Sequence, residues 1–219
     1  VGGVVEMPPG YLKHVYKHVR DAGGLCISDE VQTGFGRTGE AFWGFETVGG
    51  QGVYPDIVTT AKGIGNGCPL AAVITTPEIA KSMTSRIHFN TFGGNPVSMA
   101  QGLATLDVLL DENYQARAKK LGAVLFKGLE ALKQRHSLIG DIRGRGLMCG
   151  IELVEDHTSK TPASAKTAAI FERCKDLGLL IGKGGFFGNV LRIKPPMCLE
   201  EADIAFMLNV LDIAIGEQE

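Results

Sequence analysis

The sequence predicts an α/β fold in two parts, and three patterns in the 219-residue chain support this. Short runs rich in β-branched residues alternate with segments whose apolar residues recur at helical spacing. Glycine- and proline-rich stretches separate these segments, which is typical of an open α/β sheet with ligands beyond the carboxyl ends of its strands. After Asp111 a long helical pattern rich in Lys and Arg begins, so we expect a domain boundary there, between 1–111 and 112–219.

The first part of the chain is expected to form short strands flanked by helices. A proline in the first turn and glycines at the end predict a helix over 8–23. A helix is expected to begin at Pro77, and Asn95–Pro96 has the pattern of an N-cap followed by proline at the first helical position. Strands, the first of them buried, are expected at 25–29, 57–61 and 71–75.

The second part of the chain is expected to combine longer helices with further short strands. The helices are predicted over 113–135, 164–177 and 200–216, and the strands over 138–143, 147–153, 179–182 and 190–194. The last helix is apolar almost all round, so we expect it to be well buried.

Composition and charge exclude several classes of function. Apolar residues make up 44% of the chain, charged residues 21%, and the net charge is −2, so neither nucleic acid nor a membrane is an expected partner. The longest apolar run is interrupted by Asn209 and Asp212 and is too short to span a bilayer. His14 and His18 have the spacing of a zinc helix, but Val15 stands where a metalloprotease needs glutamate, so we expect no metal site.

Residues 28–37 (SDEVQTGFGR) place Asp29 and Glu30 side by side where an apolar run ends. Carboxylates at the end of a buried strand are costly unless something there uses them. Asp29 would lie at the edge of the sheet where ligands bind. Taken alone, it is interpreted equally well as a helix cap or a turn acid, and Glu30 is assigned no catalytic role.

The stretch TTAKGIGNG places Lys62 directly after another short strand, with several glycines behind it. Taken alone, such a lysine is most often a surface residue, and a glycine-rich stretch is weak evidence of a ligand. Together with Asp29 it indicates more. A lysine that binds an aldehyde, near an aspartate that keeps a ring nitrogen protonated, is the arrangement expected around pyridoxal phosphate (PLP).

The stretch HFNTFGGNP, residues 88–96, combines features that suit a phosphate group. Thr91 offers a hydroxyl, Gly93 and Gly94 are expected to offer backbone N–H groups, and Asn95 opens a helix. A plain helix-capping loop explains the same residues equally well.

The stretch LRIKPPM places Arg192 on a short strand among apolar neighbours. A buried guanidinium binds a planar anion well, and a substrate carboxylate fits it bidentately. An internal ion pair is the alternative interpretation.

Four stretches in this order, SDEVQTGFGRTG, AKGIGNG, FNTFGGNP and LRIKPPM, resemble the class III (omega) aminotransferases that depend on pyridoxal 5'-phosphate. The resemblance covers essentially the whole chain. It implies the α/β fold of type I PLP-dependent transferases, which is aspartate-aminotransferase-like. Residues 1–111 would be the C-terminal part of the large PLP-binding domain, and residues 112–219 the small C-terminal α+β domain.

The resemblance also implies a role for each motif residue near the cofactor ring. Asp29 would pair with the pyridine nitrogen, Val31 would pack against the ring, and Gln32 would hydrogen-bond the 3-hydroxyl group. Lys62 would form the Schiff base and then move the substrate proton as an acid–base group.

Two further residues would reach the cofactor phosphate and the substrate. Thr91 would contact the phosphate held by a neighbouring subunit, so the resemblance implies a homodimer or homotetramer. Arg192 would bind the carboxylate of the amino-acid or keto-acid substrate.

The reaction implied by the resemblance is transamination from alanine, or a related amino acid, to glyoxylate, giving pyruvate and glycine. The motifs are most similar to mitochondrial members of the class, so a mitochondrial location is expected. Ornithine, acetylornithine and GABA aminotransferases share the same core. A phospholyase acting on phosphoethanolamine-type substrates is a further alternative.

The chain begins at Val1, and members of the class are longer at the amino end. The resemblance therefore implies an N-terminally truncated chain that lacks one wall of the substrate pocket. An inactive chain is the alternative outside enzymology.

Overall fold

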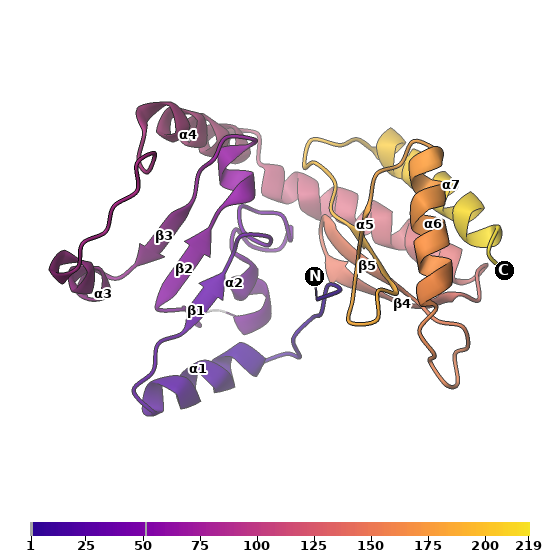
Figure 1. Ribbon diagram of the computed structural model, residues 1–219, viewed down its shortest axis with the longest axis horizontal. Helices are drawn as coiled ribbons and strands as arrows, with labels where there is room; N and C mark the ends of the chain where they lie inside the picture. Colours follow the sequence, from indigo (N-terminus) through magenta and orange to yellow (C-terminus); the bar gives the residue numbers. More distant parts are fainter. Residues whose placement is uncertain (1, 51) are drawn as a thin grey trace. The chain divides into compact units, whose positions relative to one another are not determined.

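The computed structural model describes residues 2–50 and 52–219 and divides into two units (Figure 1). One unit comprises Met7–Gln115, and the other comprises residues 2–6 with Ala116–Glu219. The boundary expected near residue 111 coincides with the last residue of α4 (Pro96–Asp111) and precedes this division.

The unit Met7–Gln115 contains a three-stranded sheet in the order β1–β2–β3. β1 (Ile27–Asp29) runs parallel to β2 (Ile57–Thr60), and β3 (Ala72–Thr75) runs antiparallel to β2. Figure 1 shows β2 between the other two. The three predicted strands are confirmed, with shorter bounds.

The expectation that the first strand is buried is wrong. Leu25 is 54% exposed and Ile27 is 60% exposed. Burial of a strand depends on what covers the sheet. In the described part of the chain nothing covers these side chains, although their apolar character predicted a core position.

Of the predicted helices of this unit, α3 (Pro77–Lys81) and α4 begin at the expected prolines. The helix predicted over 8–23 is α1 (Tyr11–Asp21), which begins only at Tyr11, with its prolines outside the helix. α4 has Asn95 as N-cap, with the Ser98 N–H donating to Asn95 Oδ1 at 3.0 Å. α2 (Gly44–Gly49) was not predicted, because six residues are too few for a periodic pattern.

An ion pair between exposed Arg20 and partly buried Asp56 fastens α1 to the amino ends of β1 and β2. Arg20 Nη2 lies 2.9 Å from Asp56 Oδ1, and the Cys26 N–H donates to Asp56 Oδ2 at 2.7 Å. Burial alone would raise the pKa of Asp56, but these hydrogen bonds lower it below its usual value. This cluster lies at the end of the strands opposite Asp29, so we assign it a structural role.

The other unit packs three helices on an antiparallel sheet of order β4–β5–β7–β6. Its helices are α5 (Tyr114–Lys133), α6 (Ser164–Asp176) and α7 (Glu201–Gly216), and its strands are β4 (Ile139–Arg145), β5 (Met148–Leu153), β6 (Gly182–Gly184) and β7 (Val190–Ile193). The core contains fully buried side chains from α5, β5, α6 and α7, such as Leu125, Ile151, Ile170 and Leu211.

Two sequence expectations for this unit need correction. The strand expected at 179–182 lies at Gly182–Gly184 instead, because pairing with β7 uses those residues, and Leu180 is 84% exposed. Leu179 belongs instead to the turn that follows α6, its N–H donating to the Cys174 carbonyl at 2.8 Å. α7 is not buried all round, because Phe206 and Ile213 are exposed while Ile204 and Leu211 are buried. Among the described residues, no helix is long and apolar enough to cross a membrane.

Candidate active site

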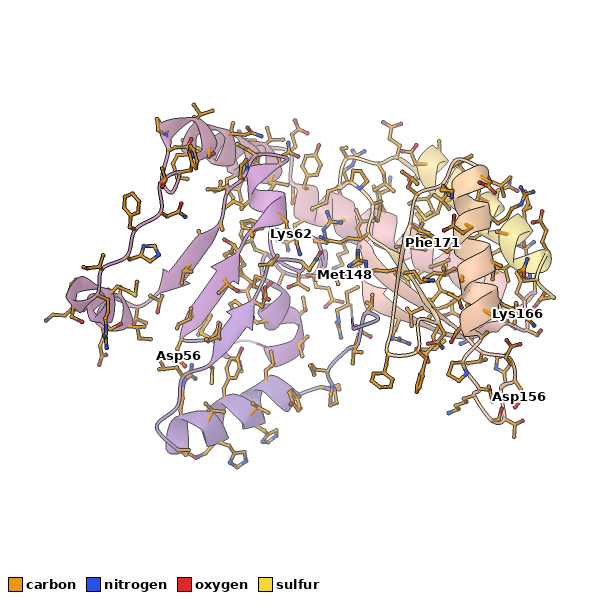
Figure 2. The ribbon with its side chains drawn as sticks, viewed as in Figure 1. Asp56, Lys62, Met148, Asp156, Lys166 and Phe171 are labelled. Carbon is orange, nitrogen blue, oxygen red and sulfur yellow. The ribbon has the colours of Figure 1, made fainter. Side chains whose placement is uncertain are left out.

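Asp29 and Lys62 lie at the carboxyl ends of two paired parallel strands. Asp29 is the last residue of β1 and stands opposite Thr59 in β2, and Lys62 follows the end of β2 (Figure 2). Both side chains are exposed. The carboxyl edge of parallel strands is where α/β folds bind ligands, so the topology brings an acid and an amine to one such edge.

The backbone of Lys62 is strained. Its φ is 53°, in the left-handed region that non-glycine residues seldom adopt, and it opens the 3₁₀ turn η1 (Lys62–Gly65). Such a conformation costs free energy and persists where the surroundings hold it, often at functional sites.

The loop after Lys62 is held by α4. Gln101 Nε2 donates to the carbonyl oxygens of Gly65 at 2.9 Å and Asn66 at 3.3 Å. Cys68 Sγ lies 3.2 Å from Ser98 Oγ. The same helix therefore positions the turn that begins at Lys62.

Val31 and Gln32 occupy a tight turn directly after β1. The Val31 N–H donates to Asp29 Oδ1 at 3.0 Å, so the turn orients the Asp29 carboxylate. Val31 and Gln32 are both half-buried.

Glu30, to which sequence reasoning gave no role, is the buried acid of this region. It is only 2% exposed, and its carboxylate accepts four hydrogen bonds. The donors are the Ser28 and Thr33 hydroxyls and the Gly44 and Phe45 N–H groups. The cost of burying a carboxylate is offset by these contacts, which satisfy both of its oxygens.

Thr91 lies on an exposed loop before α4. Gly93 is exposed as expected, and its N–H donates to Asn90 Oδ1 at 3.1 Å. Gly94 has a φ of 68°, which favours glycine at this turn. Asn95 caps α4, so the capping interpretation of this stretch holds for its last residues.

Arg192 belongs to the other unit. It lies in β7, paired with Gly150 and Gly182, and its side chain crosses Gly182 so closely that a Cβ there would lie 3.0 Å from Arg192 Nε. None of the ion pairs within residues 2–50 and 52–219 includes Arg192. The alternative interpretation of Arg192 from the sequence, an internal ion pair, is therefore not seen among the described residues.

A cleft of about 630 Å³ opens beside Arg192. Its walls are mainly apolar and come from residues 179–182, residues 192–199 and the first half of α7. A partly buried guanidinium in an apolar cleft is suited to a carboxylate. No cluster of metal-binding side chains occurs in the described part of the chain.

Comparison with known families decides the class of protein. The model of the family "aminotransferase class-III" matches residues 1–215. This chain belongs to the class-III aminotransferases. It is therefore part of an enzyme family, in agreement with the expectation drawn from its motifs.

Curated relatives within the class-III aminotransferases share about half of their residues with this chain. Alanine–glyoxylate aminotransferase 2 homolog 2, mitochondrial, from Arabidopsis thaliana is 55% identical over 217 residues, which are 99% of this chain and 45% of the relative. Human alanine–glyoxylate aminotransferase 2, mitochondrial, is 49% identical over 99% of this chain and 42% of the relative. The chain thus spans less than half the length of these relatives.

Solved structures of the class share the fold. A phospholyase from Arthrobacter in complex with phosphoethanolamine has a TM-score of 0.92 and 41% identity, over 98% of this chain and 50% of that one. An aminotransferase from Bacillus anthracis has a TM-score of 0.90 and 37% identity, with the same coverage. The predicted fold, that of type I PLP-dependent transferases, is confirmed.

Proposed function

We propose that this chain carries the cofactor lysine of a PLP-dependent aminotransferase that moves an amino group from alanine to glyoxylate. The observation that carries the proposal is the placement of Asp29 and Lys62 at one carboxyl edge of β1 and β2. The identity to alanine–glyoxylate aminotransferases supports the choice of alanine and glyoxylate. Their names also support a mitochondrial location.

The residues at this edge fit pyridoxal phosphate. Lys62 offers an exposed amine for the aldehyde, and Asp29 offers an exposed carboxylate for the ring nitrogen. When bound, the cofactor supplies an electron sink that makes the Cα–H bond of an amino acid acidic. Val31 and Gln32, in the turn next to Asp29, would contact the ring face and its 3-hydroxyl.

The chain's own groups would then bind, orient and move protons. Asp29 would hold a proton on the ring nitrogen, and the Lys62 amine, once free, would carry the proton removed from Cα. Arg192 would bind the substrate carboxylate bidentately in its apolar cleft. Thr91, on its exposed loop, would bind the phosphate held by a second copy, which makes a homodimer the expected assembly, or a homotetramer of two such dimers.

A phospholyase is the second candidate, because the Arthrobacter phospholyase is 41% identical to this chain. That phospholyase was solved in complex with phosphoethanolamine, which has no carboxylate, so such an enzyme has no use for Arg192 in this role. Release of inorganic phosphate from phosphoethanolamine, without a keto acid, would identify the lyase.

The test is a single turnover of the purified chain loaded with PLP. Alanine should give one pyruvate per bound cofactor, and glyoxylate added afterwards should give glycine. A chain that binds PLP on Lys62 but transfers no amino group from alanine contradicts the proposed reaction. GABA and ornithine, assayed alongside, separate the other aminotransferases of the class.

A further inference from the structure

We propose that Glu30 is a positioning residue that sets the orientation of the Asp29 carboxylate toward the cofactor ring; this inference rests on the proposed function. Glu30 is a buried acid one residue from Asp29. Its carboxylate bonds to Ser28, Thr33, Gly44 and Phe45, and to neither Asp29 nor Lys62 among the described residues. Its effect on Asp29 is therefore exerted through the turn that it holds.

The backbone of Glu30 fixes where the turn begins. Its N–H donates to the Thr59 carbonyl at 2.9 Å, which continues the pairing of β1 with β2 beyond Asp29. Its carbonyl accepts the Gly34 N–H at 3.0 Å and closes the turn. The residues between Glu30 and Gly34, Val31 among them, are thereby confined.

The side chain of Glu30 fixes the same turn from inside. Oε2 accepts the Thr33 hydroxyl at 2.7 Å and the Gly44 N–H at 2.8 Å, and Oε1 accepts the Phe45 N–H at 2.8 Å and the Ser28 hydroxyl at 3.1 Å. One carboxylate thus joins the strand, the turn and the first residues of α2.

The link to Asp29 is a single hydrogen bond. Val31 lies in the turn that Glu30 closes, and its N–H donates to Asp29 Oδ1 at 3.0 Å. If the turn shifts, that N–H shifts with it, and the carboxylate loses the contact that orients it. Misplacement of a group by about 1 Å can reduce its effect on a reaction strongly.

Glutamine cannot replace Glu30 at this position. Each carboxylate oxygen accepts one backbone N–H, so both must be acceptors. An amide has only one acceptor oxygen. Its NH₂ group would face the other backbone N–H, which would then have no acceptor. Glu30→Gln therefore keeps the shape of the side chain and breaks the network.

The control is Glu46→Gln. Glu46 Oε2 accepts the Trp43 N–H at 3.1 Å, so it caps the same helix without touching the turn. If Glu30 only stabilised α2, the two variants would behave alike.

The experiment loads the chain with PLP, records the absorbance of the bound cofactor against pH, and traps it with borohydride for peptide mapping. Glu30→Gln should lower the adduct on Lys62 by about tenfold, a loss equivalent to about 1.4 kcal/mol. It should also shift the pH profile in the same direction as Asp29→Asn. Glu46→Gln should match the wild type.

Two outcomes separate this inference from the proposed function. A wild-type chain with no adduct on Lys62 overturns the proposed function. A wild-type adduct together with an unchanged profile in folded Glu30→Gln overturns the positioning role alone. If Glu30→Gln does not fold, Thr33→Val replaces it as the test, because it removes one of the hydrogen-bond donors to Glu30. Thr33→Val should shift the pH profile by part of the shift seen in Asp29→Asn. An unchanged profile would overturn the inference.

Discussion

Gln101 of α4 holds the loop that begins at Lys62. Its side-chain amide donates to the Gly65 carbonyl at 2.9 Å and to the Asn66 carbonyl at 3.3 Å. The two carbonyls come three and four residues after Lys62, whose backbone is strained, with a φ of 53°. A helix far along the chain thus stabilises the conformation that presents the proposed cofactor lysine.

Gln101→Ala should loosen this loop. Loss of these hydrogen bonds should lower the free energy of unfolding by about 1 kcal/mol. The yield of PLP trapped on Lys62 should fall several-fold, because the lysine then samples other orientations. Gln134→Ala, at an exposed position after α5, is the matched control. Equal trapping in the two variants would show that Gln101 does not position Lys62.

Arg192→Lys tests the carboxylate-binding role of Arg192. A lysine keeps the charge but loses the bidentate geometry. The alanine concentration for half-maximal pyruvate formation should rise by about tenfold or more, since hydrogen bonds to charged groups contribute about 1.5–3 kcal/mol. The control is an amine donor without a carboxylate, whose reaction should not change. Equal effects on both donors would assign Arg192 a structural role.

A cluster at the end of α7 is expected to make the stability of the chain depend on pH. His136 Nε2 lies 2.6 Å from Asp212 Oδ1, and His136 Nδ1 lies 3.0 Å from Glu219 Oε2. The hydrogen bond with His136, with help from Arg135, lowers the pKa of Asp212. Burial would raise the pKa of Glu219, but its contacts with His136, Leu138 and Ser137 lower it overall.

Asp212→Asn should therefore destabilise the chain at neutral pH and lose its effect in acid. A carboxylate whose pKa is lower in the folded state contributes its full stabilisation when the pH is above its pKa in the unfolded chain, about 3.9. This stabilisation is lost as the pH falls through its pKa in the folded chain. Urea unfolding of both proteins should differ by about 1 kcal/mol at pH 7, and the difference should shrink below about pH 4. Asp107→Asn, at an exposed position of α4, is the control. A difference that stays constant in acid would contradict the linkage.

Elements marked by local signals were predictable from the sequence. Asn95 and Pro96 specify the start of α4 through a cap and a fixed φ, and the structure places it there. β6 was misplaced because its position depends on pairing with β7, which local apolar character does not encode. The exposure of Leu25 and Ile27 has a similar cause, since burial depends on elements outside the strand.

The candidate site was predictable only in part, for the same reason. Asp29 and Lys62 stood out because each follows an apolar run and precedes glycines. The role of Glu30 and the contribution of Gln101 were not predicted, because their partners lie far along the chain. Glu30 bonds to Gly44, 14 residues away, and Gln101 to Gly65, 36 residues away. No sequence pattern pairs an acid or an amide with distant backbone groups.

The central claim is that Lys62 is the cofactor lysine, and borohydride trapping tests it most directly. The purified chain is incubated with PLP, reduced, digested and mapped by mass spectrometry, beside Lys62→Arg and Asp29→Ala. We expect one dominant pyridoxyl adduct, on Lys62, that is absent from Lys62→Arg and strongly reduced in Asp29→Ala. Labelling scattered over surface lysines, and unchanged in Asp29→Ala, would contradict the claim.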